Sequence, residues 1–361
     1  MKVLVASGAS GGHIFPALSF IEALKGKGEK IEALLVLPRR SLREETFPAD
    51  LKIKHISVST IKLSLGLRNL IGFFNLLKGS FESLFLMVEY RPDVVVGFGS
   101  LNSVPLVMLA WLFRVKTMIH EQNVIPGRAN RFLANFADKI ALSFEPTKSY
   151  LKAGSDKIIV TGNPIRKHLK RIDRREALRY FGFSEDRFTI LVAGGSQGSH
   201  RINMCFIEAI ALLPGHSKIQ VIHLCGAKDF DLLLEKYEDL DLQLKLLAFL
   251  KEMQYAYSAA DIAITRAGAT TVSELLFFRL PAIIVPYPYA YAHQLSNARI
   301  LEKEKTAIIK RDDELEAAGL KTMLEDFINN PDKLSSMRRN FSAESKPDAA
   351  ALLAQESLSF N

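Results

Sequence analysis

The sequence predicts an α/β protein with two doubly wound domains, each built on a parallel sheet. Short runs of Val, Ile and Leu alternate with helix-like stretches along the 361 residues. The runs are continuous rather than interrupted by polar residues, which is typical of parallel strands covered on both faces. The alternation restarts after Gly162-Asn163-Pro164. One series of strands on each side of that break predicts two similar domains.

The expected strands follow one another at intervals that leave room for a helix. The first series is Val3–Ala6, Ala33–Leu37, Val94–Gly97, Thr117–His120 and Lys139–Leu142, and the second is Thr189–Ala193, Ile219–Leu224, Leu244–Leu247, Ile262–Thr265, Ala282–Pro286 and Ala307–Ile309. We expect domains at residues 1–163 and 164–340, and a C-terminal helical segment at 341–361 that could pack back on the first domain. Ligands of such sheets bind beyond the carboxyl ends of the strands.

One uncharged stretch, residues 94–113, is long enough to be considered as a membrane span. Glycine, serine, asparagine and proline cluster in its middle (VVVGFGSLNSVPLVMLAWLF). That composition predicts a buried strand, a glycine loop and a buried helix instead. The N-terminal apolar run is too short for a signal peptide. Two cysteines, Cys205 and Cys225, form no disulfide framework and fit a reducing cytoplasm.

The net charge of +8 lies in the first half of the chain. Residues 1–163 carry 21 Lys and Arg against 13 Asp and Glu, whereas residues 164–361 carry 26 of each. A basic half indicates an anionic partner near it: a membrane, a polyphosphate or a nucleic acid. Nucleic acid is disfavoured, because the sequence has no zinc-knuckle spacing, RRM-type aromatic motif or long basic run.

Three glycine-rich loops follow expected strands: VLVASGASGGH, VVVGFGS and ILVAGGSQGSH. Glycine lets backbone N–H groups approach an anion, and the N-terminus of the following helix favours negative charge. One such loop could be a tight turn without a ligand, but three together favour an anionic ligand. A dinucleotide enzyme is the main alternative, yet GxGxxG is absent and Glu32 begins rather than ends the second strand. An NADP site through Arg39 stays open, but it leaves the second-half loop unexplained.

The stretch TRAGATTVSELL in the second half has two interpretations. Thr271 and Glu274 have the Thr-x-x-Glu spacing of a capping box at the start of a helix. Alternatively, the Glu274 carboxylate accepts hydrogen bonds from the hydroxyl groups of a ribose. The spacing alone favours the cap, although one carboxylate has enough lone pairs for both roles.

Six motifs together resemble a known family. They are GASGGHIFPAL, HEQNVIPGRANR, VTGNPIR, LVAGGSQGSHRIN, ADIAITRAGATTVSELLFFRLPAIIVP and HQLSNARILEK, in the order and spacing typical of the MurG family of peptidoglycan glycosyltransferases. The resemblance covers about the whole chain and implies a GT-B fold, in which two Rossmann-like domains face each other across a cleft. It also implies inverting transfer of N-acetylglucosamine from UDP-GlcNAc to the C4 hydroxyl of lipid I, the undecaprenyl-linked muramyl pentapeptide, which yields lipid II.

The same resemblance implies a peripheral protein on the cytoplasmic face of the bacterial inner membrane, acting in cell-wall synthesis, cell shape and cell division. The expected partners are UDP-GlcNAc, lipid I and an anionic membrane surface bound through the first domain. Other cell-wall synthesis proteins are further candidates. We expect no metal or other cofactor, since no carboxylate cluster stands out with metal-ligand spacing. Two alternatives stay open: a related UDP-sugar transferase with another lipid acceptor such as diacylglycerol, and a nucleotide-sugar-binding protein without catalysis.

Carried over by position, the motifs of the family assign a donor site. Its UDP-GlcNAc-binding residues are Ser10, Gly11, Gly12, Asn123, Arg166, Ser196, Leu250, Ala269, Thr270, Thr271, Val272, Ser273, Glu274 and Gln294. Leu250 would lie beside the uracil, Glu274 on the ribose, and Asn123 and Gln294 on the sugar. The loop GFGSLNSVP departs from the Gly-Gly-Tyr-Val-Ser-Gly-Pro that is usual in the family. The acceptor-side residues are Gly97, Gly99 and Ser100.

Two residues are candidates for the general base, His13 and Glu121. The N-terminus of a helix disfavours imidazolium, so the ring of His13 should be neutral and able to accept a proton. The alternative is that His13 only positions a phosphate or the loop. For Glu121 the alternative is a buried carboxylate that anchors its loop. Ser196, Arg166 and a helix N-terminus could stabilise the charge on departing UDP.

The apolar stretch from Leu63 to Met87 contains Arg68 and Lys78 among many leucines and phenylalanines, Phe73 and Phe74 included. Such a segment can lie in a membrane interface, although an apolar helical stripe is more often part of a core. The number of apolar residues exceeds what one buried face needs, and the first half is basic. We therefore favour interface binding over a core helix.

Overall fold

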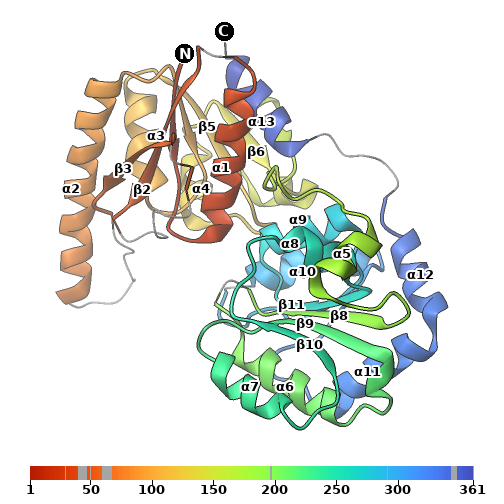
Figure 1. Ribbon diagram of the computed structural model, residues 1–361. Coiled ribbons are helices and arrows are strands. Elements are labelled where there is room, and N and C mark those ends of the chain that lie inside the picture. Colours follow the sequence, from red (N-terminus) through yellow and green to blue (C-terminus); the bar gives the residue numbers. More distant parts are fainter. Residues whose placement is uncertain are drawn as a thin grey trace. The chain divides into compact units, whose positions relative to one another are not determined.

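The computed structural model describes residues 1–28, 30–39, 47–48, 50–58, 67–195, 197–290, 292–342 and 348–360; of residues 67–73 it describes the backbone alone. The chain divides into two compact units. Unit 1 comprises residues 1–167 and 346–361, and unit 2 comprises residues 168–345. Each unit is a parallel sheet with helices packed against it (Figure 1). The predicted fold class of two doubly wound α/β domains is therefore confirmed.

The sheet of unit 1 has seven parallel strands among the described residues, in the order β3-β2-β1-β4-β5-β6-β7. Their bounds are β1 Lys2–Ala6, β2 Glu32–Pro38, β3 Lys52–Ile56, β4 Val94–Gly97, β5 Lys116–Glu121, β6 Lys139–Leu142 and β7 Ile158–Val160. The five strands predicted for the first series are confirmed. Alternate residues of β1 enter two cores, Val3 and Val5 on one face and Leu4 and Ala6 on the other.

The two edge strands of this sheet, β3 and β7, are not predicted by the sequence. Strand β3 reads KIKHI, with polar residues at alternate positions, and β7 has only three residues. In the described sheet, β3 pairs with β2 and β7 pairs with β6. An edge strand is less completely covered than a central one, so it lacks the continuous apolar run that marks a buried parallel strand.

The helices of unit 1 include α3, which forms the second part of the uncharged stretch at residues 94–113. They are α1 Gly11–Lys25, α2 Leu67–Tyr90, α3 Ser103–Leu112, α4 Arg128–Leu133 and α13 Ala349–Leu358, with 3₁₀ turns at Glu145–Tyr150 and Ser155–Lys157. Residues 94–113 form β4, a glycine loop and α3, as predicted. In the part of the chain that the structure describes, no helix is long and apolar enough to cross a membrane.

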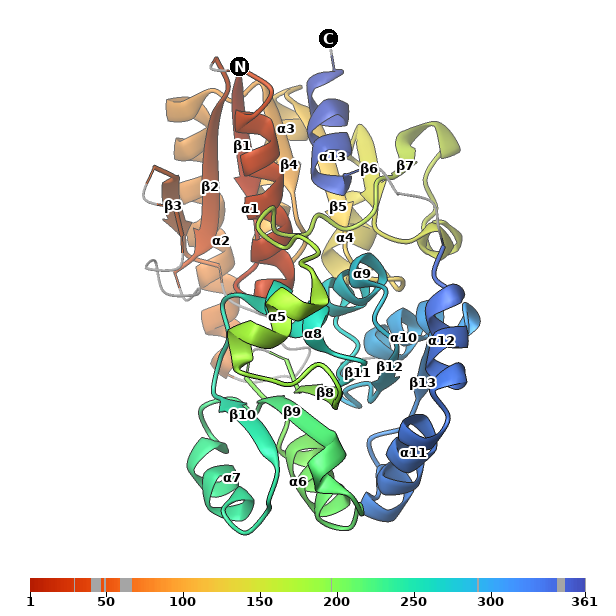
Figure 2. The same ribbon diagram turned by 45° about the vertical axis from the view of Figure 1, so that its right-hand side comes forward.

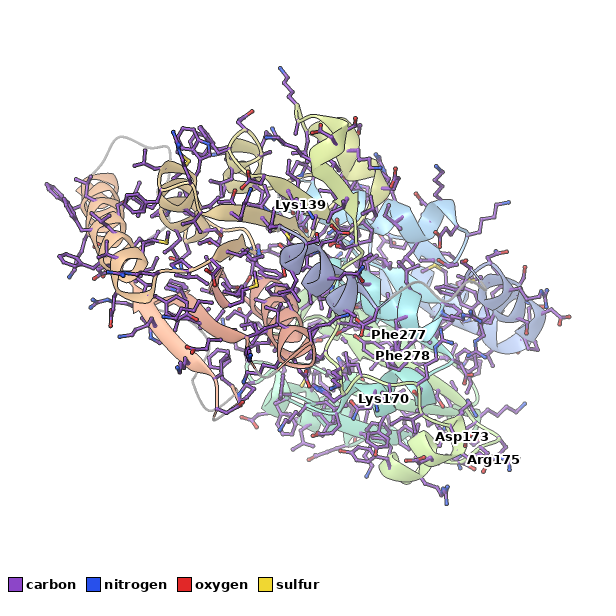
Figure 3. The ribbon with its side chains drawn as sticks, turned by 90° about the horizontal axis from the view of Figure 1, so that it is seen from above. Lys139, Lys170, Asp173, Arg175, Phe277 and Phe278 are labelled. Carbon is purple, nitrogen blue, oxygen red and sulfur yellow. The ribbon has the colours of Figure 1, made fainter. Side chains whose placement is uncertain are left out.

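The C-terminal helix α13 belongs to unit 1 and packs along α1 (Figures 1 and 2). Lys139, the first residue of β6, holds it there. The Lys139 ammonium donates to the backbone oxygen of Glu356 at 3.0 Å, to the Glu356 carboxylate at 2.8 Å and to Ser359 Oγ at 2.6 Å. It also lies 4.9 Å from the ring centroid of Phe360. Figure 3 shows Lys139 beside this helix.

The sheet of unit 2 has six parallel strands among the described residues, in the order β10-β9-β8-β11-β12-β13. They are β8 Phe188–Ala193, β9 Ile219–Leu224, β10 Gln243–Leu247, β11 Ile262–Thr265, β12 Ala282–Ile284 and β13 Ala307–Ile309. The helices are α5 Arg174–Phe181, α6 His200–Ala211, α7 Phe230–Tyr237, α8 Met253–Ala259, α9 Ala269–Phe278, α10 His293–Lys303, α11 Ala317–Asn329 and α12 Pro331–Arg339. All six predicted strands are confirmed, although β12 ends at Ile284 rather than Pro286.

Each sheet has a point where the strand order reverses. It lies between β1 and β4 in unit 1, and between β8 and β11 in unit 2. Doubly wound proteins bind their ligands outside the carboxyl ends of the strands at such a point. The three glycine loops predicted from the sequence leave β1, β4 and β8, so all three start there.

Candidate functional site

In unit 1 the first glycine loop ends at the N-terminus of α1. Ser10 occupies the cap position with an extended backbone (φ −90°, ψ 153°), and its carbonyl oxygen accepts from the N–H groups of His13 and Ile14, each at 3.0 Å. The N–H groups of Gly11 and Gly12 lie in the first turn, where an α-helix offers no internal acceptor. An anion could therefore complete this cap.

The ring of His13, in the first turn of α1, is packed between two glycines. A Cβ atom on Gly8 would lie 2.8 Å from His13 Cδ2, and one on Gly99 would lie 3.3 Å from His13 Cε1. Gly99 also has φ +79°, a left-handed conformation that glycine adopts without strain. On its other side, His13 Nδ1 lies 3.0 Å from Gln122 Oε1. Sequence reasoning does not identify Gly8 or Gln122, although Gly8 is part of the motif GASGGH and Gln122 is part of HEQN.

The loop after β4 lies against the first glycine loop. Asn102 Nδ2 donates to Ser7 O at 3.1 Å, and Ser100 Cβ is 2.7 Å from the position of a Cβ on Gly8. Ser100 has φ +67°, which is uncommon for a residue with a side chain. Gly97, the last residue of β4, leads into this loop. The three residues predicted for the acceptor side therefore lie beside the first glycine loop.

Glu121 is buried, and its carboxylate accepts four hydrogen bonds. Oε1 accepts from N and Nδ2 of Asn123 at 2.8 and 3.3 Å. Oε2 accepts from the N–H of Gly127 at 3.0 Å and from Asn130 Nδ2 at 2.9 Å. Four donors match the number of lone-pair sites that a carboxylate offers. Of the two interpretations of Glu121, this arrangement favours an anchor for the HEQN loop over a general base, and it holds Asn123 at the end of β5.

Arg166 lies beside the start of α1, within unit 1. Its guanidinium carbon is 4.8 Å from the ring centroid of Phe15. The same ring is so close to Gly11 that a Cβ there would lie 2.8 Å from it. A positive charge thus stands next to the N-terminus of α1, and both favour an anion at the first glycine loop.

In unit 2 the glycine loop after β8 is packed tightly against the loop after β9. A Cβ on Gly198 would lie 1.9 Å from the carbonyl oxygen of Cys225, and one on Gly226 would lie 2.3 Å from that of Gln197. Both glycines have positive φ, +74° and +80° respectively. Neither position has room for a side chain. Ser196, predicted to approach the nucleotide, lies outside the described residues.

Helix α9 begins earlier than the capping-box interpretation requires. Gly268 is its N-cap residue, and a helical hydrogen bond already runs from Val272 N to Gly268 O at 2.9 Å. Thr271 is therefore within the first turn and Glu274 within the second, so the capping-box prediction is wrong. The Thr-x-x-Glu spacing lies inside α9, where these two side chains cap no helix end. Glu274 is 5% exposed, and its Oε2 accepts from Tyr257 Oη at 2.7 Å.

Side chains of α10 hold the loop that leads into α9. Gln294 Oε1 accepts from the N–H groups of Ala267 at 3.0 Å and Tyr287 at 2.9 Å. Asn297 Nδ2 donates to the carbonyl oxygen of Ala267 at 3.1 Å. The backbone thus engages the oxygen of Gln294, which leaves its NH₂ group as the part that can donate to a ligand.

Arg266 connects three further loops at the same edge of the sheet. Its side chain is buried, and its guanidinium donates to Ser199 Oγ at 2.7 Å, to Val285 O at 3.0 Å and to the carboxylate of Asp312. These partners follow β8, β12 and β13. Sequence reasoning does not identify Arg266, because its partners lie 67, 19 and 46 positions away. Its position in the motif TRAGATT is the sequence feature that could have pointed to it.

The predicted donor residues fall into two groups, one on each unit. Unit 1 carries Ser10, Gly11, Gly12, Asn123 and Arg166, and unit 2 carries Leu250, Ala269, Thr270, Thr271, Val272, Ser273, Glu274 and Gln294. In unit 2 they lie in the segments that follow the carboxyl ends of β10, β11 and β12, with Leu250 buried in the first of these. Within each unit, residues far apart in the sequence therefore meet at one edge of the sheet.

Known families, curated relatives and a solved structure match this chain over nearly its whole length. The N-terminal domain of glycosyltransferase family 28 matches residues 3–142, and its C-terminal domain matches residues 189–353. A Halothermothrix orenii protein named UDP-N-acetylglucosamine--N-acetylmuramyl-(pentapeptide) pyrophosphoryl-undecaprenol N-acetylglucosamine transferase is 37% identical, covering 96% of this chain and 95% of its own. A Thermodesulfovibrio yellowstonii protein of the same name is 34% identical, covering 97% and 96%. The crystal structure of Acinetobacter baumannii MurG is similar, with a TM-score of 0.79 and 25% identity over 99% of both chains.

Proposed function

The chain belongs to the family of UDP-N-acetylglucosamine--N-acetylmuramyl-(pentapeptide) pyrophosphoryl-undecaprenol N-acetylglucosamine transferases, within glycosyltransferase family 28, and from that premise we propose its reaction. It moves N-acetylglucosamine from UDP-GlcNAc to the C4 hydroxyl of lipid I and so makes lipid II for peptidoglycan. Its two Rossmann-like domains are those of the GT-B fold. The observation that carries the proposal is the first glycine loop, where helix N–H groups, the His13 imidazole and the Arg166 guanidinium meet.

The proposed reaction needs one base and no protein nucleophile. His13 Nε2 takes the proton of the C4 hydroxyl while that oxygen attacks C1 of N-acetylglucosamine. The bond from C1 to the β-phosphate oxygen breaks, and its electron pair leaves with UDP. Negative charge then develops on the diphosphate, for which Arg166 and the N-terminus of α1 supply positive partners. Because the hydroxyl attacks from the side opposite the leaving group, the configuration at C1 is inverted.

We assign the uridine and the sugar of the donor to unit 2 and the acceptor to unit 1, whose Arg166 and α1 N-terminus also serve the donor diphosphate. Unit 2 binds the nucleotide sugar, with Glu274 on the ribose, Leu250 beside the uracil and Gln294 on the sugar. Unit 1 binds the lipid-linked acceptor, because it carries His13 and the loop after β4. The excess of basic residues in the first half supports the same assignment, since the acceptor is anchored in an anionic membrane.

Turnover tests the proposed reaction directly. UDP-GlcNAc and a soluble lipid I analogue should yield UDP and a product heavier by one N-acetylglucosamine residue, as detected by mass spectrometry. Diacylglycerol in place of the analogue tests the first alternative, and transfer to it alone would overturn the acceptor. Binding of UDP-GlcNAc without transfer to either acceptor would favour a binding protein without catalysis.

We expect Glu274→Ala to weaken UDP-GlcNAc binding by roughly 1–3 kcal/mol, because the ribose hydroxyls lose a charged acceptor. Titration calorimetry measures the change. Tyr257→Phe is the matched control: it removes the hydroxyl that donates to Glu274 but leaves the carboxylate, so its effect should be smaller. Both variants alter a buried hydrogen bond, and melting curves must show that they fold. Unchanged affinity in folded Glu274→Ala would remove Glu274 from the site.

Helix α2 exposes a stripe of large apolar side chains. Its members are Phe74, Leu77, Phe81, Phe85 and Val88, with exposed fractions of 61, 41, 63, 75 and 58%. Intervals of three and four residues place them on one face of the helix. Buried side chains occupy another face, so α2 has a core face and an apolar outer face. Of the two phenylalanines singled out in the sequence, Phe74 is exposed, and the side chain of Phe73 lies outside the described residues.

We propose that this outer face binds an anionic membrane surface and makes the protein peripheral to the cytoplasmic face of the inner membrane. The neighbouring helix α3 packs on α2 and ends in a second exposed apolar group. Its members are Trp111, Leu112 and Phe113, exposed by 47, 63 and 47%. A group of large exposed apolar side chains on one helix face is unusual on a soluble protein and marks a site that meets another apolar surface. Lys78 and Arg114, both exposed, add positive charge beside it.

Binding to anionic vesicles should weaken as salt rises without vanishing. Each basic residue near the surface contributes about 1 kcal/mol that salt screens, whereas buried apolar side chains contribute a part that salt does not screen. Phe81→Ser combined with Phe85→Ser should reduce vesicle binding in sedimentation assays and leave UDP-GlcNAc affinity intact.

A control for this double variant changes two exposed leucines of unit 2. Leu212→Ser with Leu234→Ser, at positions 60 and 49% exposed, should bind vesicles like wild type. If the folded phenylalanine variant also binds like wild type, the contact surface lies elsewhere. If it unfolds, the stripe is part of a core.

A further inference from the structure

A chain of hydrogen bonds leads from the interior of unit 1 to the ring of His13. His13 Nδ1 lies 3.0 Å from Gln122 Oε1, and Gln122 Nε2 lies 3.0 Å from His120 Nδ1 and 3.1 Å from His120 O. His120 Nε2 in turn lies 3.1 Å from Gly162 O. Gln122 is 1% exposed and His120 is fully buried, whereas His13 is half-buried.

The carbonyl oxygens at the inner end decide where each proton lies. A carbonyl oxygen only accepts, so Gly162 O requires the proton of neutral His120 on Nε2, and His120 Nδ1 is then an acceptor. The Gln122 amide must turn its NH₂ group towards His120, where the ring nitrogen and the backbone oxygen both accept. Its oxygen therefore faces His13 and also only accepts. The proton of neutral His13 consequently lies on Nδ1.

Burial keeps His120 neutral and so maintains the donor-to-acceptor direction of this series of hydrogen bonds. It lowers the pKa of His120 to about 4, because the charged ring would lose its hydration. The ring centroid of Phe98 lies 5.3 Å from that of His120. Near neutral pH, His120 therefore offers one donor and one acceptor, and its bond to Gly162 determines which nitrogen is which.

We propose that Gln122 and His120 are positioning residues that hold His13 in its Nδ1–H tautomer and leave the lone pair of Nε2 free to accept a proton. A free histidine side chain in water favours the opposite tautomer, in which Nε2 carries the proton and is no base. The ring packs between Gly8 and Gly99, where an added Cβ would lie 2.8 and 3.3 Å from its carbon atoms. The kinetic consequence rests on the proposed function, but the tautomer does not.

Nitrogen-15 NMR of the unliganded, histidine-labelled protein reports the tautomer, since protonated and unprotonated ring nitrogens resonate apart. At about pH 8, above the ordinary histidine pKa, we expect wild-type His13 to carry its proton on Nδ1, and His13→Asn assigns its signals. Gln122→Met keeps the length of the side chain without an amide and should shift His13 towards the Nε2–H form. Gln122→Glu keeps an acceptor and should retain the Nδ1–H form. A wild-type His13 in the Nε2–H form would overturn the proposal without any variant.

Kinetics with UDP-GlcNAc and the lipid I analogue give a second test. We expect folded Gln122→Met to lower kcat by roughly 10- to 100-fold, the range known for the hydrogen-bond partners of metal-bound histidines, with the Kd of UDP-GlcNAc unchanged. Gln122→Glu should retain more activity than Gln122→Met. Wild-type kcat in folded Gln122→Met would overturn the positioning role. If the wild type has the Nδ1–H tautomer but transfers no sugar, the proposed function fails and the tautomer assignment stands.

Discussion

His13→Asn should lower kcat by roughly 100- to 10,000-fold, the range that a general base contributes, while the Kd of UDP-GlcNAc changes little. Asparagine can still donate an N–H to Gln122 Oε1, which His13 Nδ1 contacts at 3.0 Å. It has no basic nitrogen, however, so it cannot take the proton of the C4 hydroxyl. The variant therefore keeps the positioning contact and removes the base. Steady-state turnover with the lipid I analogue measures kcat, and calorimetry measures Kd.

His13→Ala is the companion variant, because it removes the contact as well as the base. It should be no faster than His13→Asn, and alanine is compatible with the first turn of α1. A small loss of kcat in His13→Asn together with weaker substrate binding would support the positioning role of His13 instead. The proposed chemistry uses no metal ion, so turnover that collapses in excess EDTA would contradict it.

The central strands of both sheets could be predicted from the sequence, whereas β3 and β7, the edge strands of the unit 1 sheet, could not. A strand such as β4, covered on both faces, needs apolar residues at consecutive positions, and that need is legible in the run Val94-Val95-Val96. Strand β3 has covered and uncovered positions in alternation, so KIKHI resembles a loop. The first residue of α9 could not be predicted either, because the N-cap residue Gly268 has no side chain and so leaves no capping pattern in the sequence.

The candidate site was predictable where one segment carries it. The start of α1 brings Ser10, Gly11, Gly12 and His13 together within four residues, so the quoted motif already contains the arrangement. The role of Gln122 depends on a hydrogen bond across 109 positions, and that of His120 depends on a carbonyl 42 positions away. No local spacing encodes either contact. They exist because parallel strands end at the same edge of a sheet.

Lowering the pH from 7 to 5 should remove on the order of 2 kcal/mol of unfolding free energy for each of two buried histidines, one in each unit. Burial lowers the pKa of His120 from 6.5 to about 4 and that of His223 from 6.5 to about 3. As the pH falls, the unfolded chain takes up these protons first. The stability is therefore fully present above about pH 6.5 and is lost as the pH falls towards the folded-state values. Denaturant titrations at the two pH values measure the loss.

His223 serves as the control because it lies outside the proposed catalytic machinery, and both of its ring nitrogens have defined partners. Nε2 lies 3.1 Å from Asn203 Oδ1, and Nδ1 lies 2.8 Å from Tyr237 Oη. Asn203 turns its NH₂ group towards Cys225 O at 2.9 Å, so its oxygen accepts and His223 Nε2 carries the proton. The Tyr237 hydroxyl then donates to Nδ1. A protonated ring would donate from Nδ1 to the hydroxyl oxygen, so this bond would reverse and the hydroxyl proton would need another acceptor.

His223→Gln should make the loss between pH 7 and pH 5 about half as large, because an amide can offer a donor and an acceptor but does not titrate there. The variant should be less stable than wild type at pH 7, since a flexible amide does not reproduce the shape of the buried ring. The exposed carboxylate of Asp50 does not compete in this window. Asp50, whose pKa is lowered by its hydrogen bond to Lys25, starts from 3.8 and takes up its proton only at lower pH. A variant that loses as much stability as wild type between the two pH values would place the titration outside His223.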